Sequence, residues 1–444
     1  MTNDQQVGQS GTAPIRRREF LKTTLGASSL LALDGAMPAF LARTARAAGG
    51  GRAERGTVLV VIQLSGGNDG LNTVVPFEDD AYQRSRPTLR LSGEQVLKLG
   101  AGVGLHPAMP AFQRLFDEGR LSIIQGVGYP ESSRDHSEAM QNWHTARPEA
   151  NLEQTGWLGR ALDRTWARGE TDLPGVFIGS IAAPFSLRTE QAVVPAIQSL
   201  EAWLPAKDPA VAWPRVPPDV PAGGGRGSGA GPFAAPVGLP LASNTLADFL
   251  GRTAAQAAAC EARLETARQA ATSGMGGYSA FGLARSLQLI AALMRAELGI
   301  RVYSVELGGG GIGGFDTHAG QAANHGALLR ELAESVSAFV ADLRRDKLLD
   351  SMLLMTFSEF GRTLAENGRR GTDHGAAAPV FAAGGRVQGG LLGSWPSLTD
   401  LEGGAPKFHT DFRRVYATVL ERWLGFDSRE VLGGSYAPLE GLIA

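Results

Sequence analysis

The sequence predicts an α/β protein: a doubly wound, mostly parallel sheet flanked by helices. Several short runs are apolar without polar alternation, which is typical of strands buried on both faces of a parallel sheet. Long segments with apolar residues at helical spacing lie between these runs. Such sheets bind ligands at the carboxyl ends of their strands, so we expect the chemistry in the turns that follow them.

Five predicted strands and two long predicted helices carry this fold class. The strands share an uninterrupted apolar run and begin at Val58, Leu121, Ile300, Ser351 and Pro379. One helix, in "SAFGLARSLQLIAALMRAEL", precedes the third strand, and another, in "HGALLRELAESVSAFVADLRRDK", precedes the fourth. This alternation of strand and helix is what a doubly wound sheet requires.

Length and composition indicate a globular chain with a substantial core. The 444 residues are 43% hydrophobic, and the formal net charge is -2 with a pI near 6.4. This charge gives no electrostatic footprint for nucleic acid, so no nucleic-acid partner is expected. Cys260 is the single cysteine, which excludes an internal disulfide.

The N-terminal segment has the form of a twin-arginine export signal. Arg17 and Arg18, in "RRREFLK", are the pair that the twin-arginine translocase would bind. An "ARA" tripeptide has the form of a signal-peptidase site, so residues 1–47 are predicted to be removed on export to the periplasm or beyond. No stable membrane anchor is expected, because Asp34 and Pro38 interrupt an apolar stretch that is short of the ~20 residues a span needs.

The remainder, residues 56–444, is predicted to be a single α/β domain with one insertion. Residues 203–240 are dense in proline and glycine, which is typical of a long surface loop. This loop is either an active-site lid or a tolerated insertion, and the sequence leaves both interpretations open.

Three motifs late in the chain place carboxylates beside histidines in turns near strand ends. They are "FDTH" with Asp316 and His318, "SEFGRT" with Glu359 and Arg362, and "GTDHG" with Asp373 and His374. Each motif alone is more often a cap or a turn, but their coincidence at strand ends predicts a divalent metal site. Imidazoles favour zinc, manganese or iron, and with these carboxylates calcium and magnesium stay candidates.

Two earlier turns carry further candidate residues. The turn "LSGGNDGLN" presents Ser65, Asn68 and Asp69, and its glycines suit either close backbone approach or anion binding by amides. Ser137 begins a predicted helix after the Leu121 strand, where backbone N–H groups favour an anionic group and a serine nucleophile. The alternative is that Ser137 is only a first-turn residue and that the neighbouring His136 is structural.

The motifs "RRREFLK", "LSGGNDGLNTVVP", "RDHSEAMQNWHTA", "FDTHAGQ", "SEFGRTLAENGRRGTDHG" and "VQGGLLGSWPSL" together resemble the bacterial domain-of-unknown-function 1501 family. That family is similar in turn to the alkaline phosphatase and sulfatase superfamily, whose members hydrolyse or transfer phosphate and sulfate esters over one or two metals. The resemblance implies that Asp316, His318, Glu359 and His374 are metal ligands, and Asp373 beside them is either a further ligand or the residue that orients its neighbour. It also places Ser137 near the nucleophile position.

Two departures from the superfamily pattern bear on this implied site. Phe360 stands where the superfamily has a histidine after the acid. The first strand ends in Ser65-Gly66-Gly67 where the superfamily has a metal-binding aspartate, and Asp69 replaces it as a ligand only if the turn folds back.

The function predicted from these residues is that of an exported, metal-dependent hydrolase acting on a phosphate or sulfate ester of a small molecule or polysaccharide. Ser137 or water would attack, and Arg362 would hold the oxygens of the transferred group. The alternative is a non-catalytic envelope binding or assembly protein that retains the hydrolase fold.

Overall fold

A computed structural model describes most of the chain after residue 55. The described ranges are 56–100, 102–148, 154–169, 173–179, 182–198, 277–308 and 314–444. The predicted signal peptide with Arg17 and Arg18, the predicted loop at 203–240 and Cys260 lie outside the described residues.

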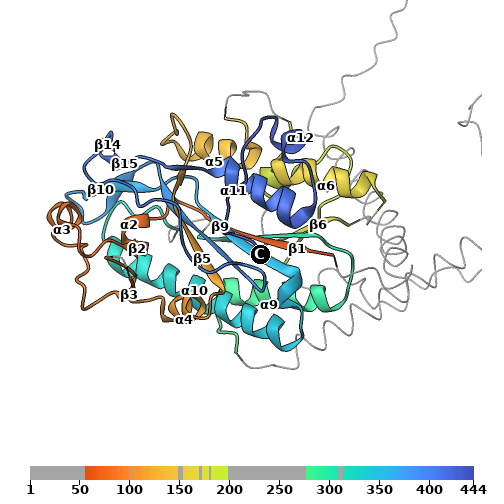
Figure 1. The fold of residues 1–444 in the computed structure, drawn as a ribbon, viewed down its shortest axis with the longest axis horizontal. Helices are drawn as coiled ribbons and strands as arrows, with labels where there is room; N and C mark the ends of the chain where they lie inside the picture. Colours follow the sequence, from red (N-terminus) through yellow and green to blue (C-terminus); the bar gives the residue numbers. More distant parts are fainter. Residues whose placement is uncertain are drawn as a thin grey trace, which may run out of the picture.

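A nine-stranded sheet forms the centre of the molecule (Figure 1). Its strands are β1 (Val58–Leu64), β5 (Leu121–Gly128), β6 (Gly175–Ile178), β7 (Ala196–Ile197), β8 (Val302–Leu307), β9 (Met352–Phe357), β12 (Ala378–Gly384), β13 (Gly390–Leu392) and β16 (Thr410–Asp411). The order is β13-β5-β12-β9-β1-β8-β6-β7, with β16 paired to β5. The five predicted strands are confirmed as β1, β5, β8, β9 and β12, and the predicted α/β class with a mostly parallel sheet is confirmed with them.

The strand β12 runs antiparallel to both of its neighbours, β5 and β9, whereas the other pairings of this sheet are parallel. The start of β12 therefore lies at the same edge as the carboxyl ends of β1, β5, β8 and β9. Residues that precede β12 meet residues that follow the other four strands. In Figure 1 this edge faces α2 (Gly70–Thr73) and β10 (Arg362–Glu366).

Two layers of helices cover the sheet because the side chains of β1 alternate between two apolar cores. Val58, Val60 and Ile62 pack with one layer and Leu59 and Val61 with the other. The first layer holds α4 (Pro110–Asp117), α9 (Gly282–Arg295) and α10 (Gln321–Arg345). The second holds α5 (His136–Thr145), α6 (Trp157–Ala167), α11 (Phe412–Thr418), η3 (Val419–Leu424) and α12 (Ser428–Leu432).

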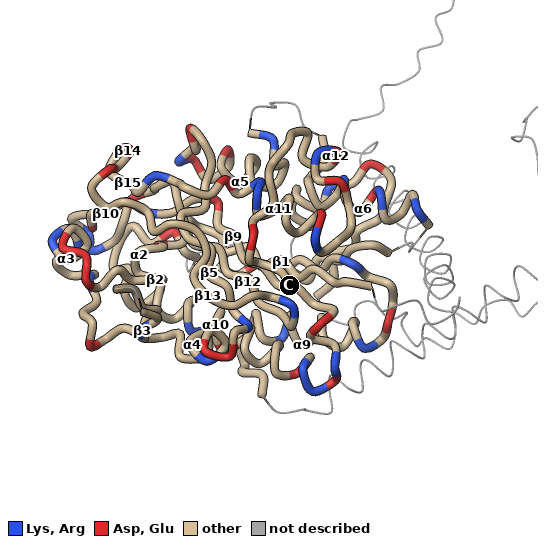
Figure 2. The backbone as a smooth tube through the Cα atoms, viewed as in Figure 1, with Lys and Arg blue, Asp and Glu red and all other residues tan. Residues whose placement is uncertain are grey.

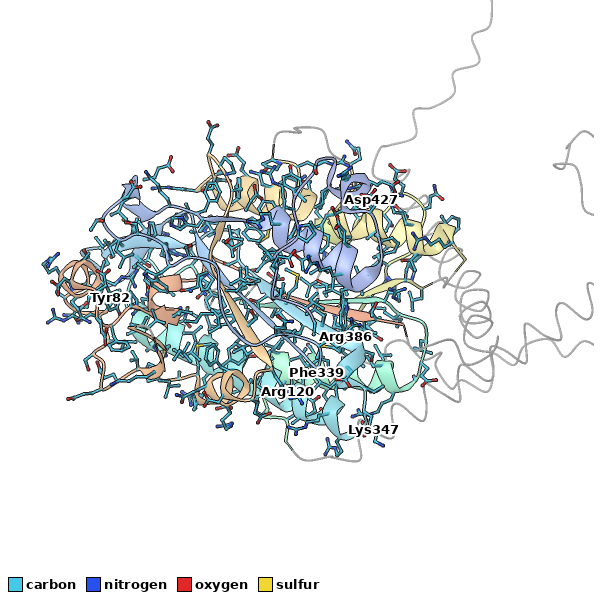
Figure 3. The ribbon with its side chains drawn as sticks, viewed as in Figure 1. Tyr82, Arg120, Phe339, Lys347, Arg386 and Asp427 are labelled. Atoms are coloured by element: carbon cyan, nitrogen blue, oxygen red, sulfur yellow. The ribbon has the colours of Figure 1, made fainter. Side chains whose placement is uncertain are left out.

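Burial on both faces explains why these strands are apolar throughout. Every residue of β1 is buried, and full burial of a large aliphatic side chain stabilises the fold by roughly 1.5–3 kcal/mol. Phe339 of α10, labelled in Figure 3, is fully buried in the first layer. The two predicted long helices correspond to α9 and α10.

Smaller elements connect these strands and helices. They are α3 (Asp80–Ser85), β2 (Val74–Val75), β3 (Leu97–Gly100), β4 (Val103–Leu105), β11 (Thr372–His374), β14 (Leu401–Glu402) and β15 (Ala405–Pro406), with short turns η1 (Phe185–Leu187) and η2 (Leu349–Ser351). A small separate core joins some of them, and Tyr82 of α3 is buried in it (Figure 3).

The charged side chains of both signs are interspersed over the outer helices and loops (Figure 2). On α3, for example, Arg84 and Asp80 form an exposed pair with their atoms 3.5 Å apart. Within the described ranges, no helix is long and apolar enough to cross a membrane.

Candidate metal centre

The candidate site lies at the carboxyl edge of the sheet and is built from four segments. His136 begins α5 after β5, and Asp316 and His318 lie between β8 and α10. Glu359 follows β9, and His374 ends β11 just before β12. The reversed direction of β12 brings His374 to the edge where the other residues lie.

The position of His136 depends on the cap of α5. The Asp135 side chain accepts hydrogen bonds from the backbone N–H of Ser137 at 2.9 Å and of Glu138 at 3.1 Å. This N-cap fixes His136 as the first helical residue. Ala139 and Trp143 are buried on the inner face of the helix and hold it against the second core.

Imidazole nitrogens and a carboxylate converge in this site. His136, Asp316 and His374 each offer one ligand atom, and these atoms all lie within 4.8 Å of one another. His318 completes the group, because its Nε2 lies 3.0 Å from Asp316 Oδ1 and 2.9 Å from His374 Nε2. Three imidazoles therefore surround one carboxylate.

The opposite nitrogen of each ring faces an atom that only accepts hydrogen bonds. His136 Nδ1 lies 3.0 Å from Glu359 Oε1, and His318 Nδ1 lies 3.3 Å from Asp373 Oδ1. His374 Nδ1 lies 2.6 Å from the backbone oxygen of Arg134. These acceptors assign the proton of each neutral ring to Nδ1 and leave Nε2 with a free lone pair.

This assignment leaves no proton between the two closest rings. The Nε2 atoms of His318 and His374, 2.9 Å apart, then face each other as two lone pairs beside Asp316. Such an arrangement is unfavourable without a cation among the three groups. Burial lowers the pKa of His374, so its ring is held in the neutral form that a metal requires.

Asp316 supplies the anionic oxygen at the centre. Burial alone would raise the pKa of Asp316, but the hydrogen bond and the positive charge of Arg362 lower it to about 2. Its side chain is 45% exposed, so the centre opens to solvent on one side. A substrate can therefore reach the carboxylate.

Glu359 was predicted to be a ligand, and the structure places it behind His136 instead. Its carboxylate is 2% exposed and accepts hydrogen bonds from the backbone N–H of Gly66 at 2.8 Å and from the Ser358 hydroxyl at 3.2 Å. Asp373 has a similar position behind His318, and Asn367 donates to it at 3.0 Å. Both carboxylates orient rings.

Arg362 was predicted to hold a substrate group, but its guanidinium is used within the protein. It donates to the backbone oxygens of Gly67 at 2.7 Å, Thr372 at 2.9 Å and Phe315 at 3.0 Å, and also to that of Gly66. A further hydrogen bond of 2.8 Å reaches Asp316, and the Arg362 side chain is 0% exposed. Because Arg362 is buried among these partners, its guanidinium is not open to an incoming ligand.

Asp69 was predicted to be a metal ligand, and its position differs from that role. Its carboxylate is fully buried and forms two hydrogen bonds with Arg86, at 2.6 and 2.9 Å. Gln321 also donates to it. Burial alone would raise the pKa of Asp69, but the Arg86 guanidinium lowers it. The first-strand turn does not fold back, because Arg86 satisfies the carboxylate.

In the described hydrogen bonds, the hydroxyl of Ser137, the predicted nucleophile, contacts no residue of the centre. Ser137 is exposed, and no hydrogen bond of its hydroxyl is found among the described residues. Phe360, in contrast, fills the centre where the superfamily histidine was expected. Its ring centroid lies 4.4 Å from that of His374 and 4.9 Å from that of His136, so it packs against two of the imidazoles.

His136 was not predicted to be a ligand, and the sequence offered a structural role for it only as the alternative to Ser137 as nucleophile. The signal was present, because the histidine lies at a helix start after a predicted strand, next to an aspartate that caps the helix. The sequence predicted a catalytic role for the neighbouring Ser137 instead.

The fold and these side chains define a class: an α/β protein with a histidine and aspartate group that can hold a metal at the carboxyl edge of its sheet. Residues 243–437 match the family model described as "Protein of unknown function (DUF1501)". The predicted resemblance to that family is thereby confirmed over these residues. The motifs quoted from the first 150 residues lie outside the match.

Solved structures of similar fold share little sequence with this chain. Lipoteichoic acid synthase LtaP from Listeria monocytogenes is 9% identical, with a TM-score of 0.38 over 85% of this chain and 76% of that one. The C-terminal periplasmic domain of EptC from Escherichia coli, in complex with zinc, is 9% identical, with a TM-score of 0.35 over 74% and 72%. An alkaline phosphatase superfamily protein from Vibrio parahaemolyticus is 9% identical, with a TM-score of 0.31 over 77% and 63%. No curated protein sequence matches the chain.

Proposed function

We propose that this protein is a metal-dependent hydrolase of phosphate or sulfate esters, exported by the twin-arginine route through Arg17 and Arg18. One observation carries the proposal: three imidazoles with Nδ1 held by acceptors direct Nε2 toward the carboxylate of Asp316. The family resemblance supplies the ester class, as a small molecule or a polysaccharide. The alternative, a non-catalytic envelope binding protein, becomes an outcome of the test.

The donor set fits a borderline divalent cation. His136, His318 and His374 would hold it together with Asp316, and zinc, manganese or iron suit three imidazoles and one carboxylate better than calcium or magnesium do. When bound, such a cation supplies positive charge that stabilises the charge developing on the transferred group.

Residues that lie behind the four donor side chains hold them in position. Glu359 and Asp373 hold the rings of His136 and His318, as carboxylates behind metal-bound histidines do. Phe360 packs beside His136 and His374 and excludes water from that side. The open side at Asp316 is where an ester would enter.

Arg362 provides a fixed positive charge beside the centre. Its guanidinium contacts Asp316 and four backbone oxygens, a set of acceptors that would otherwise suit a second hard cation. We infer that the site takes a single metal ion, with Arg362 in place of a second.

The test is metal analysis of the protein purified from the periplasm, followed by assays with p-nitrophenyl phosphate and p-nitrophenyl sulfate. We expect one metal ion per chain and turnover of at least one ester. His136→Ala should weaken zinc binding and abolish turnover, because it removes one of the imidazole donors.

The matched control is His409→Ala, which removes an exposed histidine outside the centre. It should keep both the metal and the turnover. Protein without metal, or zinc binding unchanged in His136→Ala, contradicts the hydrolase. One metal per chain with no turnover of either ester favours the binding role instead.

A further inference from the structure

A hydrogen-bonded network of polar side chains lies at the carboxyl ends of β1 and β8, outside the metal centre. It consists of His144, Gln63, Ser65 and Glu306. Gln63 and Glu306 pair in register across the two strands, and Ser65 lies two residues after Gln63 on the same face. Polar side chains here interrupt strands that are otherwise apolar.

In this network each side chain donates a hydrogen bond to the next, from His144 to Glu306. Burial lowers the pKa of His144 to about 4, so its ring is neutral, and Nε2 lies 2.8 Å from Gln63 Oε1, an acceptor. Gln63 Nε2 donates to the Ser65 hydroxyl at 2.8 Å, and that hydroxyl donates to Glu306 Oε1 at 2.5 Å. The Ser65 proton therefore points at the Glu306 carboxylate.

Backbone contacts hold Ser65 beside the metal centre. The backbone oxygen of Ser65 accepts from Phe315 N at 2.9 Å, one residue before Asp316. The next residue, Gly66, donates its N–H to Glu359 Oε1 at 2.8 Å, the same oxygen that contacts His136. Ser65 and Glu306 are both partly exposed, so the pair is not sealed within the core.

A short contact between serine and glutamate is not by itself unusual in this protein. Ser428 donates to Glu421 Oε1 at the same 2.5 Å, but Ser428 is 1% exposed and lies far along the chain on α12. Ser65 differs because it is partly exposed, accepts a hydrogen bond from Gln63, and borders the centre. The Ser428 pair is thus an internal control.

We propose that Ser65 is the attacking nucleophile of the ester hydrolysis and that Glu306 accepts its proton, which rests on the proposed function. The Ser65 oxygen forms a bond to phosphorus or sulfur while the ester bond breaks, its proton moves to Glu306, and the leaving oxygen departs as an alcohol with a proton from solvent. Water then displaces Ser65 from the covalent group and returns a proton to solvent. Glu306 gives its proton back to the Ser65 oxygen.

The test is covalent labelling by diisopropyl fluorophosphate, in which serine attack on phosphorus displaces fluoride. The purified protein is treated with and without zinc, and the labelled peptide is identified by mass spectrometry. We expect the label on Ser65, and a rate roughly 100-fold lower in Glu306→Gln, which keeps the hydrogen bond but removes the base. Glu421→Gln, the matched control, should label at the unaltered rate.

Ser65→Ala should also lose turnover of whichever p-nitrophenyl ester the unaltered chain hydrolyses. Mapping on the unaltered chain needs no variant, so the test stands even if Ser65→Ala fails to fold. A label on Ser137, no label on Ser65, equal rates in Glu306→Gln, or retained turnover in folded Ser65→Ala overturns the assignment. A labelled Ser65 without ester turnover supports the reactive serine and contradicts the proposed function.

Discussion

At the scale of single residues, the centre depends on acceptors that lie behind its histidines. A ring with one nitrogen held by an acceptor keeps a defined tautomer and a defined direction for the other nitrogen. Glu359 does this for His136, and its hydrogen bond raises the pKa of that ring. The same contact that orients the ring also makes it a better proton acceptor, so protons compete with metal there.

This competition gives a pH-dependent prediction for Glu359→Gln. Because the pKa of His136 is raised above 6.5, zinc affinity of the unaltered protein should begin to fall while the pH is still above the ordinary histidine range. In Glu359→Gln, the onset should move to lower pH, and zinc affinity at pH 8 should fall roughly 10- to 100-fold because the ring loses its orienting carboxylate. Zinc titrations between pH 5 and 8 measure both effects.

The control for this variant is Glu138→Gln, on the same helix as His136. Glu138 contacts the hydroxyl of Ser133 and no residue of the centre in the described hydrogen bonds. Zinc affinity and its pH onset should match those of the unaltered chain. An unchanged onset in Glu359→Gln would show that Glu359 does not govern His136.

The sequence predicted that part of this group of side chains would come together, and its metal binding stays a prediction. Asp316, His318 and His374 lie in short glycine-flanked motifs at strand ends, so their convergence follows from the sheet. The positions of Asp69 and Arg362 could not be predicted, because their partners, Arg86 and a set of backbone oxygens, come from distant parts of the chain. The local sequence does not determine which buried, positively charged side chain pairs with a carboxylate.

At the scale of elements, the glycine turn after β1 sets how closely two segments approach. Gly66 has a φ of 116°, and a Cβ added there would lie 2.4 Å from the backbone nitrogen of Asp316. Only glycine allows the turn to pack directly on the segment that carries Asp316. The sequence predicted close approach at this turn, but it could not say what approaches.

Gly66→Ala should therefore disturb the centre, and Gly100→Ala is its matched control. Both glycines have a positive φ, 116° and 100°, but a Cβ at Gly100 meets nothing within 4 Å. We expect Gly66→Ala to lower the free energy of unfolding by about 1–3 kcal/mol more than Gly100→Ala, and to weaken zinc binding because Asp316 must shift. Urea unfolding and zinc titration test this, and equal effects of the two substitutions would contradict it.

The sequence did not predict the direction of strand β12, which runs antiparallel to its neighbours. Its apolar run was recognised, but an apolar run carries no sign of parallel or antiparallel pairing. The direction decides on which edge His374 falls, since His374 precedes β12 instead of following a strand. The strands themselves were therefore predictable. What could not be predicted is that the site combines residues that follow parallel strands with a residue that precedes the antiparallel strand β12.

At the scale of the whole molecule, two histidines, His144 and His325, are buried away from the centre, and a third, His106, is half-buried. Burial lowers the pKa of His144 and of His106 to about 4, and that of His325 to about 3. His325 contacts Asn68 at 3.0 Å, so the ring is held as a neutral partner. The folded state thus resists protonation at positions that protonate freely once the chain unfolds.

Stability should consequently fall in mild acid, before carboxylates are protonated. The folded pKa of His144, about 4, lies below the ordinary value of 6.5, so the folded state binds fewer protons than the unfolded chain between these values. Stability from keeping His144 neutral is complete above pH 6.5 and is lost as the pH falls toward 4. One such group contributes a slope of up to about 1.4 kcal/mol per pH unit.

His144→Gln isolates this contribution, because glutamine can still donate to Gln63 but does not titrate. Urea unfolding of metal-depleted protein at pH 7.5 measures the cost of changing the packing, and the same measurement between pH 6.5 and 5 gives the slope. We expect the slope in the variant to be smaller than in the unaltered chain, while His106 and His325 keep their part of it. Identical slopes would mean that His144 is not neutral in the folded state, and the one-way hydrogen bonding from His144 to Ser65 would lose its basis.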